Sequence, residues 1–196
     1  MNVTGFYTFL FDSFVRSNTV LEGKDSIFYE GVLSQVQTLD NLADTEVYGI
    51  QTSVKIQPYK RLKITSTFNF QVGRDDFGDE IVTPSRHSNP WYGTTKVHYT
   101  KEKLSLVAYA AYSGKKRFDD LAPGERTKLE LYAIDKNGNP YSPSWLTFNI
   151  KANYRFAEHW GISGGLENIT DRRYRTFSSG LSAPGRNFIL SLKASF

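Results

Sequence analysis

Eight segments of the chain alternate apolar and polar residues with the period of two that a β-strand requires. The predicted strands span residues 3–12, 46–57, 62–72, 91–99, 104–112, 146–156, 160–168 and 188–196. In the final segment, Phe188, Leu190, Leu192 and Phe196 share one face, and mostly polar residues occupy the other. The pattern predicts an all-β protein built from about eight antiparallel strands.

The connections between these segments alternate in length. Long segments at 13–44, 74–90, 114–143 and 169–185 are separated by the short turns QPYK, TKEK and AEH. Within the long segments, SIFYEGVLSQVQ is a possible strand extension, and TKLELYAI with the turn DKNGNP predicts a protruding hairpin. Short turns at one end and long loops at the other are typical of transmembrane β-barrels, with the turns in the periplasm and the long loops outside the cell.

The two faces of the predicted strands differ in polarity. One face is apolar on nearly every strand, whereas the other carries Thr, Asn, Gln, Lys and Arg and would make a poor soluble core. Aromatic residues also gather near strand ends, as they do at membrane interfaces. A soluble β-sandwich with an aromatic core remains the alternative, because its antiparallel strands have the same period.

Composition narrows the class of protein. The chain has 196 residues, of which 39% are apolar, and its longest apolar run, 106–112, is too short for a membrane helix. The absence of cysteine excludes disulfides, thiolate metal sites, thiol catalysis and attached haem. A net charge of +4, spread along the chain, gives no reason to expect nucleic acid as a partner. The N-terminus has no secretory signal pattern, so we expect a mature protein or a piece of a longer one.

The sequence near the C-terminus resembles a known family. ENITDRRYRTFSSGLSAPGRNF, residues 167–188, is similar to the signature that closes the barrel of TonB-dependent outer-membrane receptors, and residues 41–56 match the family more moderately. The signature residues are Asn168, Thr170, Asp171, Tyr174, Pro184, Gly185, Arg186, Asn187 and Phe188. The alternating end of the chain also resembles the signal for barrel insertion, carried here by Phe188, Leu190, Leu192 and Phe196.

This resemblance implies a function. Residues 1–196 would be the C-terminal segment of a 22-stranded barrel, without the earlier strands, the plug domain or the segment that TonB grips. The parent would be an active transporter in the outer membrane of a Gram-negative bacterium, not an enzyme, and would take up a ferric siderophore or another iron complex. Haem, cobalamin and glycans are other ligands of the family. TonB and the plug would be partners through the full-length parent, and no cofactor is expected.

Candidate ligand-binding residues lie in the long loops. They are Arg74, Arg86, His87, Arg117, Arg126 and Arg173. A basic set of this kind would attract an anionic iron chelate or, equally, anionic lipopolysaccharide of the membrane. The three histidines have no metal-ligand spacing, so no metal site is expected.

Two other functions are compatible with the pattern. A small standalone eight-stranded barrel would act as an adhesin or a structural protein. A barrel enzyme active at the rim would use Asp75 and Asp76 with His87, or the pair Asp119 and Asp120.

Overall fold

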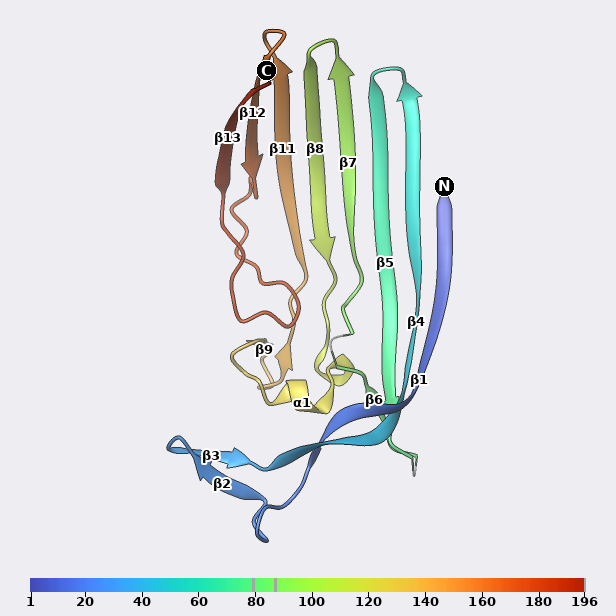
Figure 1. Cartoon of the computed structure of the whole chain (residues 1–196), viewed down its shortest axis with the longest axis vertical. Coiled ribbons are helices and arrows are strands. Elements are labelled where there is room, and N and C mark those ends of the chain that lie inside the picture. The colour runs from blue at the N-terminus through green and yellow to red at the C-terminus, as the bar shows by residue number, and fades with distance from the viewer. Residues whose placement is uncertain (79, 87, 196) are drawn as a thin grey trace.

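One large antiparallel sheet dominates the computed structural model, which describes residues 1–78, 80–86 and 88–195 (Figure 1). Its strands follow the order β1-β4-β5-β7-β8-β11-β12-β13, and β6 pairs with β5 outside this path. The bounds are β1 (Asn2–Asn18), β4 (Gln37–Tyr59), β5 (Leu62–Asp76), β6 (Val82–Pro84), β7 (Tyr92–Lys101), β8 (Leu104–Ser113), β11 (Trp145–Arg155), β12 (Trp160–Glu167) and β13 (Asn187–Ala194).

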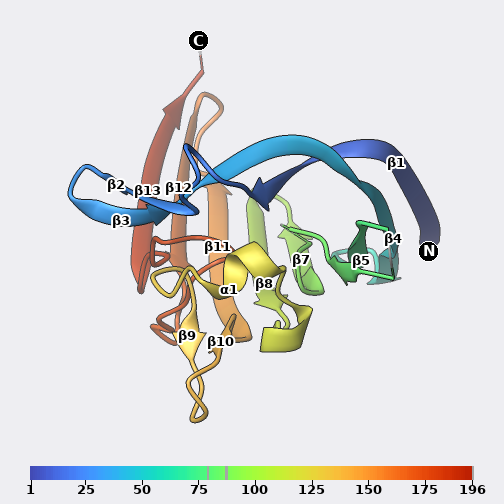
Figure 2. The ribbon, with the colours of Figure 1, turned by 90° about the horizontal axis from the view of Figure 1, so that it is seen from below.

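The all-β antiparallel prediction is confirmed, but the count of about eight strands is not. The described residues contain thirteen strands, of which nine belong to the main sheet. The sheet is also not a closed barrel, because β1 and β13 are its two edges and do not pair with each other. Figure 2, which views the molecule from its loop end, shows the sheet curved like part of a barrel wall.

The two faces of the sheet differ in exposure as well as in polarity. On β11, Leu146 and Phe148 are 44% and 47% exposed, whereas Thr147 and Asn149 between them are 3% and 7% exposed. Strand register aligns Leu146 with Tyr112 of β8, and Tyr112 with Gly93 of β7, so the apolar face continues across the strands. At the loop end of β11 the apolar side chains are therefore exposed and the polar ones are covered, whereas the polar face of β4 is exposed at Gln51, Ser53 and Lys55.

The short turns all lie at one end of the sheet, and the long connections lie at the other (Figure 1). Strand β4 turns into β5, β7 into β8, and β11 into β12 at the turn end. Among the described residues, no helix is long and apolar enough to cross a membrane.

The first long segment is not a loop, which corrects the interpretation of 13–44. Strands β1 and β4 remain paired as far as Asn18 and Gln37, and the hairpin of β2 (Ser26–Tyr29) and β3 (Val32–Gln35) follows. We call residues 13–44 the arm. The possible strand extension SIFYEGVLSQVQ corresponds to β2 and β3. The paired strands on either side of it were not predicted, because most of their described side chains are partly or fully exposed and such strands need no apolar period, only backbone pairing.

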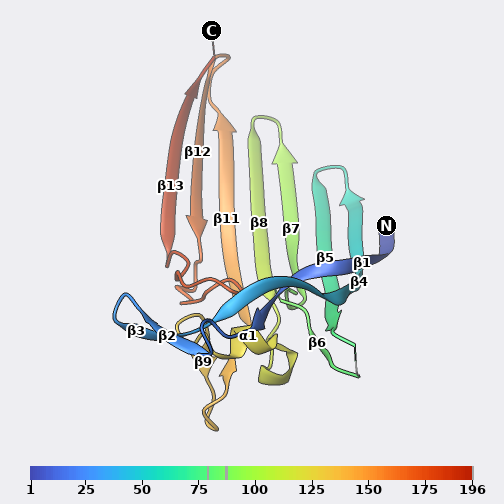
Figure 3. The same cartoon turned by 60° about the horizontal axis from the view of Figure 1, so that its bottom comes forward.

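A bulge bends the arm away from the plane of the sheet. The register between β1 and β4 shifts on both sides of Ser13, and Asp12 adopts a positive φ of 51°. The backbone N–H of Asp12 donates to the Asp44 carboxylate at 3.1 Å, and the Ser13 hydroxyl donates to the Ala43 carbonyl at 2.6 Å. Bulges of this kind re-aim a strand pair, and here the arm crosses the loop end of the sheet towards β12 and β13 (Figures 2 and 3).

The third long segment contains the predicted hairpin, in a shorter form. Strands β9 (Ala133–Ile134) and β10 (Pro140–Tyr141) pair around a turn in which Gly138 has a φ of +84°. The Asp135 carboxylate accepts hydrogen bonds from the N–H groups of Asn137 and Asn139, at 2.8 and 2.9 Å. The preceding residues form a 3-10 turn, η1 (Phe118–Asp120), and a short helix, α1 (Pro123–Arg126), neither of which was predicted.

Candidate functional site at the loop end

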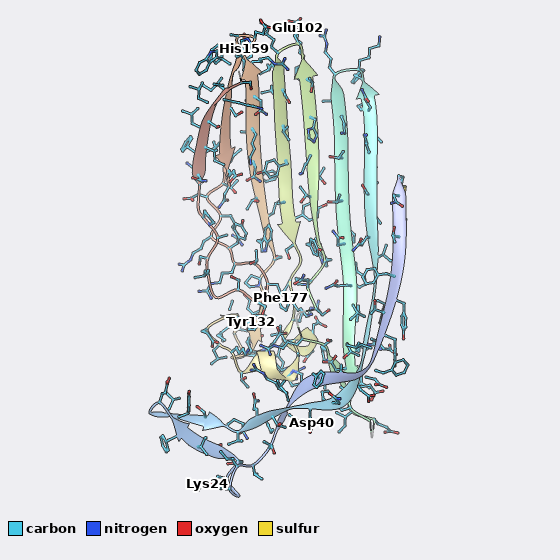
Figure 4. The ribbon with its side chains drawn as sticks, in the orientation of Figure 1. Lys24, Asp40, Glu102, Tyr132, His159 and Phe177 are labelled. Carbon is cyan, nitrogen blue, oxygen red and sulfur yellow. The ribbon has the colours of Figure 1, made fainter. Side chains whose placement is uncertain are left out.

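The long loops pack into a layer with its own buried core. Leu121 and Glu125 are the largest fully buried side chains in the described part of the chain, at 0% and 1% exposure. Tyr132 is 6% exposed, and its ring lies 6.1 Å from that of Phe177 in the next long loop (Figure 4). The loops therefore form a folded layer, not a set of independent flexible connections.

A buried lysine joins three parts of this layer. The Lys116 ammonium donates to the Ser88 carbonyl and lies 5.1 Å from the centroid of the Phe177 ring. Burial lowers the pKa of Lys116, although Glu125 and Asp120 oppose this effect. Burial, followed by the charge of Glu125, raises the pKa of Tyr132.

These opposite pKa shifts predict a maximum in the stability of the loop layer at alkaline pH. Folded Lys116 loses its proton below the ordinary pKa of 10.5, so stability rises with pH between the lowered value and 10.5. Folded Tyr132 keeps its proton above the ordinary pKa of 10.0, whereas the unfolded chain loses it there. The stability of the loop layer therefore falls as the pH rises above 10.0. Limited proteolysis from about pH 7 to about pH 11, normalised to an unfolded peptide, measures both effects. Lys116→Met should remove the rise and Tyr132→Phe the fall; a profile unchanged by either variant contradicts the assignment.

The signature residues form a hydrogen-bonded staple between the end of β12 and the start of β13. Asn168 is 4% exposed and has a positive φ of 47°. Its amide donates to the carbonyls of Arg172 and Pro184, at 2.9 and 3.1 Å, and its side-chain oxygen accepts from the N–H of Arg172 at 2.9 Å. Its own N–H donates to the Asn149 side chain at 2.8 Å, which ties the staple to β11.

Asp171 and Gly185 complete the staple. The Asp171 carboxylate accepts from the N–H of Arg186 at 2.7 Å. A Cβ added to Gly185 would lie 2.7 Å from the same carboxylate oxygen, so a side chain at this position would have to displace the Asp171 carboxylate. The Arg186 guanidinium donates to the Ile169 carbonyl at 3.0 Å. The signature thus has a structural role: it fixes the last long loop.

Two further contacts hold the last loop against its neighbours. The Tyr174 ring lies 4.5 Å from that of Trp145 at the start of β11. The Arg175 guanidinium donates to the Glu130 carbonyl at 2.7 Å, across to the third long loop. Arg175 is therefore part of the packing of the layer.

A groove of about 530 Å³ lies between the arm, the end of β5 and α1. We call it the arm groove; it is lined by residues 10, 13–14, 16, 37, 39, 45, 75, 77, 83–86, 122–124 and 127–128. Among the described residues that line it, Arg16, Arg86 and Lys128 are cationic and Asp75 is the one acid. Thr45 donates to that carboxylate at 2.9 Å, and Asp75 is 8% exposed. The groove therefore has an excess of positive charge suited to an anionic ligand.

The structure distributes the predicted ligand residues over several places. Arg86 lines the arm groove, and Arg74 lines a second groove beside β6. Arg173 lines a third hollow, of about 310 Å³, near β10. Arg117 is exposed at the start of η1. His87 lies outside the described residues.

Arg126 makes contacts within its own loop. Its guanidinium donates to the carbonyls of Leu121 and Asp119, at 3.0 and 3.2 Å, and lies 4.7 Å from the centroid of the Phe118 ring. These contacts hold η1 against α1. A ligand would compete with them for the same guanidinium.

Sequence reasoning did not select Arg16 and Lys128, which line the arm groove. Arg16 was not selected because residues 13–44 were interpreted as a loop. Had they been interpreted as paired strands, Arg16 would have been placed near the cations of the other long loops. Lys128 was hidden because the short helix α1 was not predicted. The available signal for Arg16 was its position on an extended β1, two residues after Phe14 and on the same face of the strand.

The carboxylates of the alternative enzyme site have structural partners. Asp75 accepts from Thr45, and Asp76 accepts from the Gly78 N–H at 2.9 Å. Among residues 1–78, 80–86 and 88–195, no group of three or more potential metal ligands occurs.

The proposed insertion signal lies on the edge strand β13. Phe188 and Leu190 are both 78% exposed, and Leu192 is 63% exposed. Phe196 lies outside the described residues. Recognition by an insertion machinery stays a prediction.

The comparison with protein families decides the class of the protein. The family described as TonB dependent receptor-like, beta-barrel, matches residues 1–169. This chain belongs to the TonB-dependent receptor family. The match covers most of the chain and ends before most of the signature residues, so it rests largely on other positions.

Solved structures of TonB-dependent receptors share the fold. The copper transporter OprC matches with a TM-score of 0.73 at 14% identity, over 99% of this chain and 28% of its own. A mutant of the ferric enterobactin receptor PfeA from Pseudomonas aeruginosa, in complex with enterobactin, gives 0.68 at 15% identity, over 99% and 29%. The iron transporter FrpB from Neisseria meningitidis gives 0.68 at 14% identity, over 99% and 28%. This chain therefore spans less than a third of the length of these receptors. No curated protein sequence matches it.

Proposed function

We propose that this chain forms the C-terminal part of the barrel of an outer-membrane transporter that takes up an anionic iron complex, most simply a ferric siderophore. The arm groove carries the proposal, because Arg16, Arg86 and Lys128 line it at the loop end, and Asp75 is the one acid among its described lining residues. The relatives include receptors named for ferric enterobactin and ferric citrate.

The open sheet supports a role within a larger barrel. Its edge strands β1 and β13 are unpaired along their outer sides, and hydrocarbon does not tolerate unpaired backbone groups. Additional strands of the parent would satisfy both edges. This favours the receptor over the standalone barrel acting as an adhesin.

Energy for transport would come from TonB acting on the plug of the parent. The wall segment would supply part of the ligand surface, and the predicted Arg74, Arg117, Arg126, Arg173 and His87 stay candidates for it. Location in the outer membrane of a Gram-negative cell is part of this proposal and follows the family.

Removing the three cations of the arm groove is expected to weaken uptake. In the complete receptor, Arg16→Ala with Arg86→Ala and Lys128→Ala should raise the half-saturating concentration of the preferred complex about tenfold or more, because the positive field is lost. The measurement is uptake of radiolabelled ferric enterobactin and ferric citrate by iron-limited cells.

The matched control is Lys136→Ala, which removes an exposed cation from the turn between β9 and β10. It should leave half-saturation unchanged. If the triple variant has the same half-saturating concentration as the wild type, the arm groove is not the ligand-binding site. If cells with the wild-type receptor accumulate neither of these complexes nor any other iron chelate, the proposal of iron transport is wrong.

A further inference from the structure

The outer end of the arm carries a dense set of exposed apolar side chains. We call residues 19–36 the arm tip; it contains the hairpin of β2 and β3, in which Phe28 lies opposite Leu33 and Tyr29 opposite Val32. The large apolar side chains of the tip that are more than half exposed are Val20, Leu21, Phe28, Tyr29, Val32 and Leu33. An apolar surface of this density indicates a contact site for another part of a protein.

The described chain offers the hairpin no surface that buries these side chains. Strands β2 and β3 make extensive contact with each other, but not with any other strand or helix among residues 1–78, 80–86 and 88–195. A lone two-stranded hairpin is marginally stable in water, because it cannot bury a core of its own. The tip therefore needs a further surface if it is to keep one conformation.

Hydrogen bonds extend along the arm and join the hairpin to it. The Thr19 N–H donates to the Val36 carbonyl at 3.1 Å, and the Val36 N–H donates to the Asp25 carbonyl at 2.7 Å. The Gln35 side chain donates to the same Asp25 carbonyl at 2.9 Å. The paired strands β1 and β4 therefore continue into the hairpin, and the direction of the arm decides where the tip lies.

The arm is long enough to carry the tip past the far edge of the sheet. From Ala43 beside the bulge to Val32, the chain covers 43 − 32 = 11 residues of almost continuous strand, or about 36 Å at about 3.3 Å per residue. The seven steps from β1 to β13 span about 34 Å along the curved sheet, at about 4.8 Å per step, and less in a straight line. In Figures 2 and 3 the hairpin extends beyond β13.

The barrel of a complete receptor would continue at the β13 edge. The outer side of β13 is unpaired, and a closed barrel pairs its last strand with its first. This chain spans less than a third of the length of the receptors that share its fold. A tip that extends beyond β13 at the loop end would therefore meet the outer loops of the first strands of the receptor.

The charge of the tip distinguishes this partner from others. Glu22, Asp25 and Glu30 outnumber the one lysine of the tip, Lys24, and all four side chains are exposed. An anionic lipid surface would repel this charge. A symmetric contact between two copies would bring the same acids together. Loops that present apolar side chains next to lysine or arginine are the complementary surface.

We propose that the arm tip docks onto the outer loops of the first barrel strands of the complete receptor, with the apolar side chains of β2 and β3 buried in the contact. The arm then joins the two parts of the barrel that meet at the β13 edge and holds them together at the loop end. This inference rests on the proposed place of the chain in a larger barrel and not on the ligand that the receptor transports.

Photo-crosslinking in the complete receptor tests the contact. With p-benzoylphenylalanine at position 28, which keeps an aromatic ring there, illumination of intact cells should join the tip to an outer loop of the first barrel strands of the same chain. Mass spectrometry of the digested receptor identifies the joined peptides. The matched position is 129, because Leu129 is 57% exposed in the third long loop, and it should give no such product.

Hydrogen–deuterium exchange measures whether the contact holds the tip in place. Phe28→Ser with Leu33→Ser should make amide exchange in residues 26–35 about tenfold faster or more, because the contact loses buried apolar area. Leu129→Ala should leave these rates unchanged. The crosslink is made without the serine substitutions, so a hairpin that fails to form in the serine variant does not affect it.

Other outcomes would overturn the docking. Crosslinks from position 28 to the plug, to a second copy or to another protein would each assign the tip to a different partner, and no crosslink at all would show a free tip. Iron uptake separates the two proposals. A crosslink to the first strands without uptake of any iron chelate rejects transport alone, and normal uptake with a crosslink elsewhere rejects the docking alone.

Discussion

Asn168→Ala is expected to lower the free energy of unfolding by about 3 kcal/mol. Its side chain makes three hydrogen bonds to Arg172 and Pro184 in a buried site, each contributing about 1 kcal/mol. Alanine also adopts the positive φ of this position less readily than asparagine. The measurement is the temperature at which the complete receptor loses its compact form on semi-native electrophoresis.

Two variants isolate the cause of this loss. Thr170→Ala changes an exposed residue of the same signature and should cost less than about 0.5 kcal/mol. Asn168→Gly removes the hydrogen bonds but accepts the positive φ, so its cost should reflect the bonds without the backbone strain. Equal temperatures for Asn168→Ala and Thr170→Ala would contradict the role assigned to the staple.

Leu121→Ala is expected to unfold the loop layer without opening the barrel. Leu121 is fully buried, and truncating such a leucine costs about 3 kcal/mol through lost burial and the cavity left behind. The loss falls on a layer outside the sheet, so the loops should become protease-sensitive while the strands stay protected. Proteolysis of intact cells, followed by mapping of the cleavage sites, measures this effect.

Leu129→Ala provides the matched control, because Leu129 belongs to the same loop and is 57% exposed. It should leave the cleavage pattern unchanged. If Leu121→Ala also left the loops resistant, the buried core would not be what holds the layer together. Loss of heat-resistant compactness in Leu121→Ala would instead show that layer and barrel unfold as one unit.

The sheet was predictable from sequence because its strands have one apolar face. Residues 62–72 and 146–156 alternate so regularly that each corresponds to a strand of the structure, β5 and β11. Most of the arm was not predictable in this way, since the described side chains of its strands are mostly exposed or half-buried and show no apolar period. The bend of the arm depends on a bulge at Ser13, and no local sequence pattern predicts this bulge.

The site was less predictable than the sheet because proximity in the loop layer is set by tertiary packing. Arg74 and Arg86 are close in sequence, yet they line different grooves. Arg126 looked like a ligand residue by its position in a basic loop, but its guanidinium bonds to Leu121 and Asp119. Only the signature around Asn168 was recognisable from sequence, and its contacts are structural.

The strands on the β4 and β5 side of the sheet are longer than those on the β12 and β13 side, which would give the barrel of a complete receptor an oblique mouth. Strand β5 has 15 residues and β13 has 8, and the difference of 15 − 8 = 7 residues corresponds to about 23 Å of wall at about 3.3 Å per residue. Strand β13 ends at the turn end, where Ala194 pairs with Trp160 at the start of β12, so it is at the loop end, where it begins at Asn187, that β13 is short. On the side of the short strands, the loop before β13 forms the part of the wall that longer strands form elsewhere. A change in the length of this loop would alter the height of the entrance without changing the sheet.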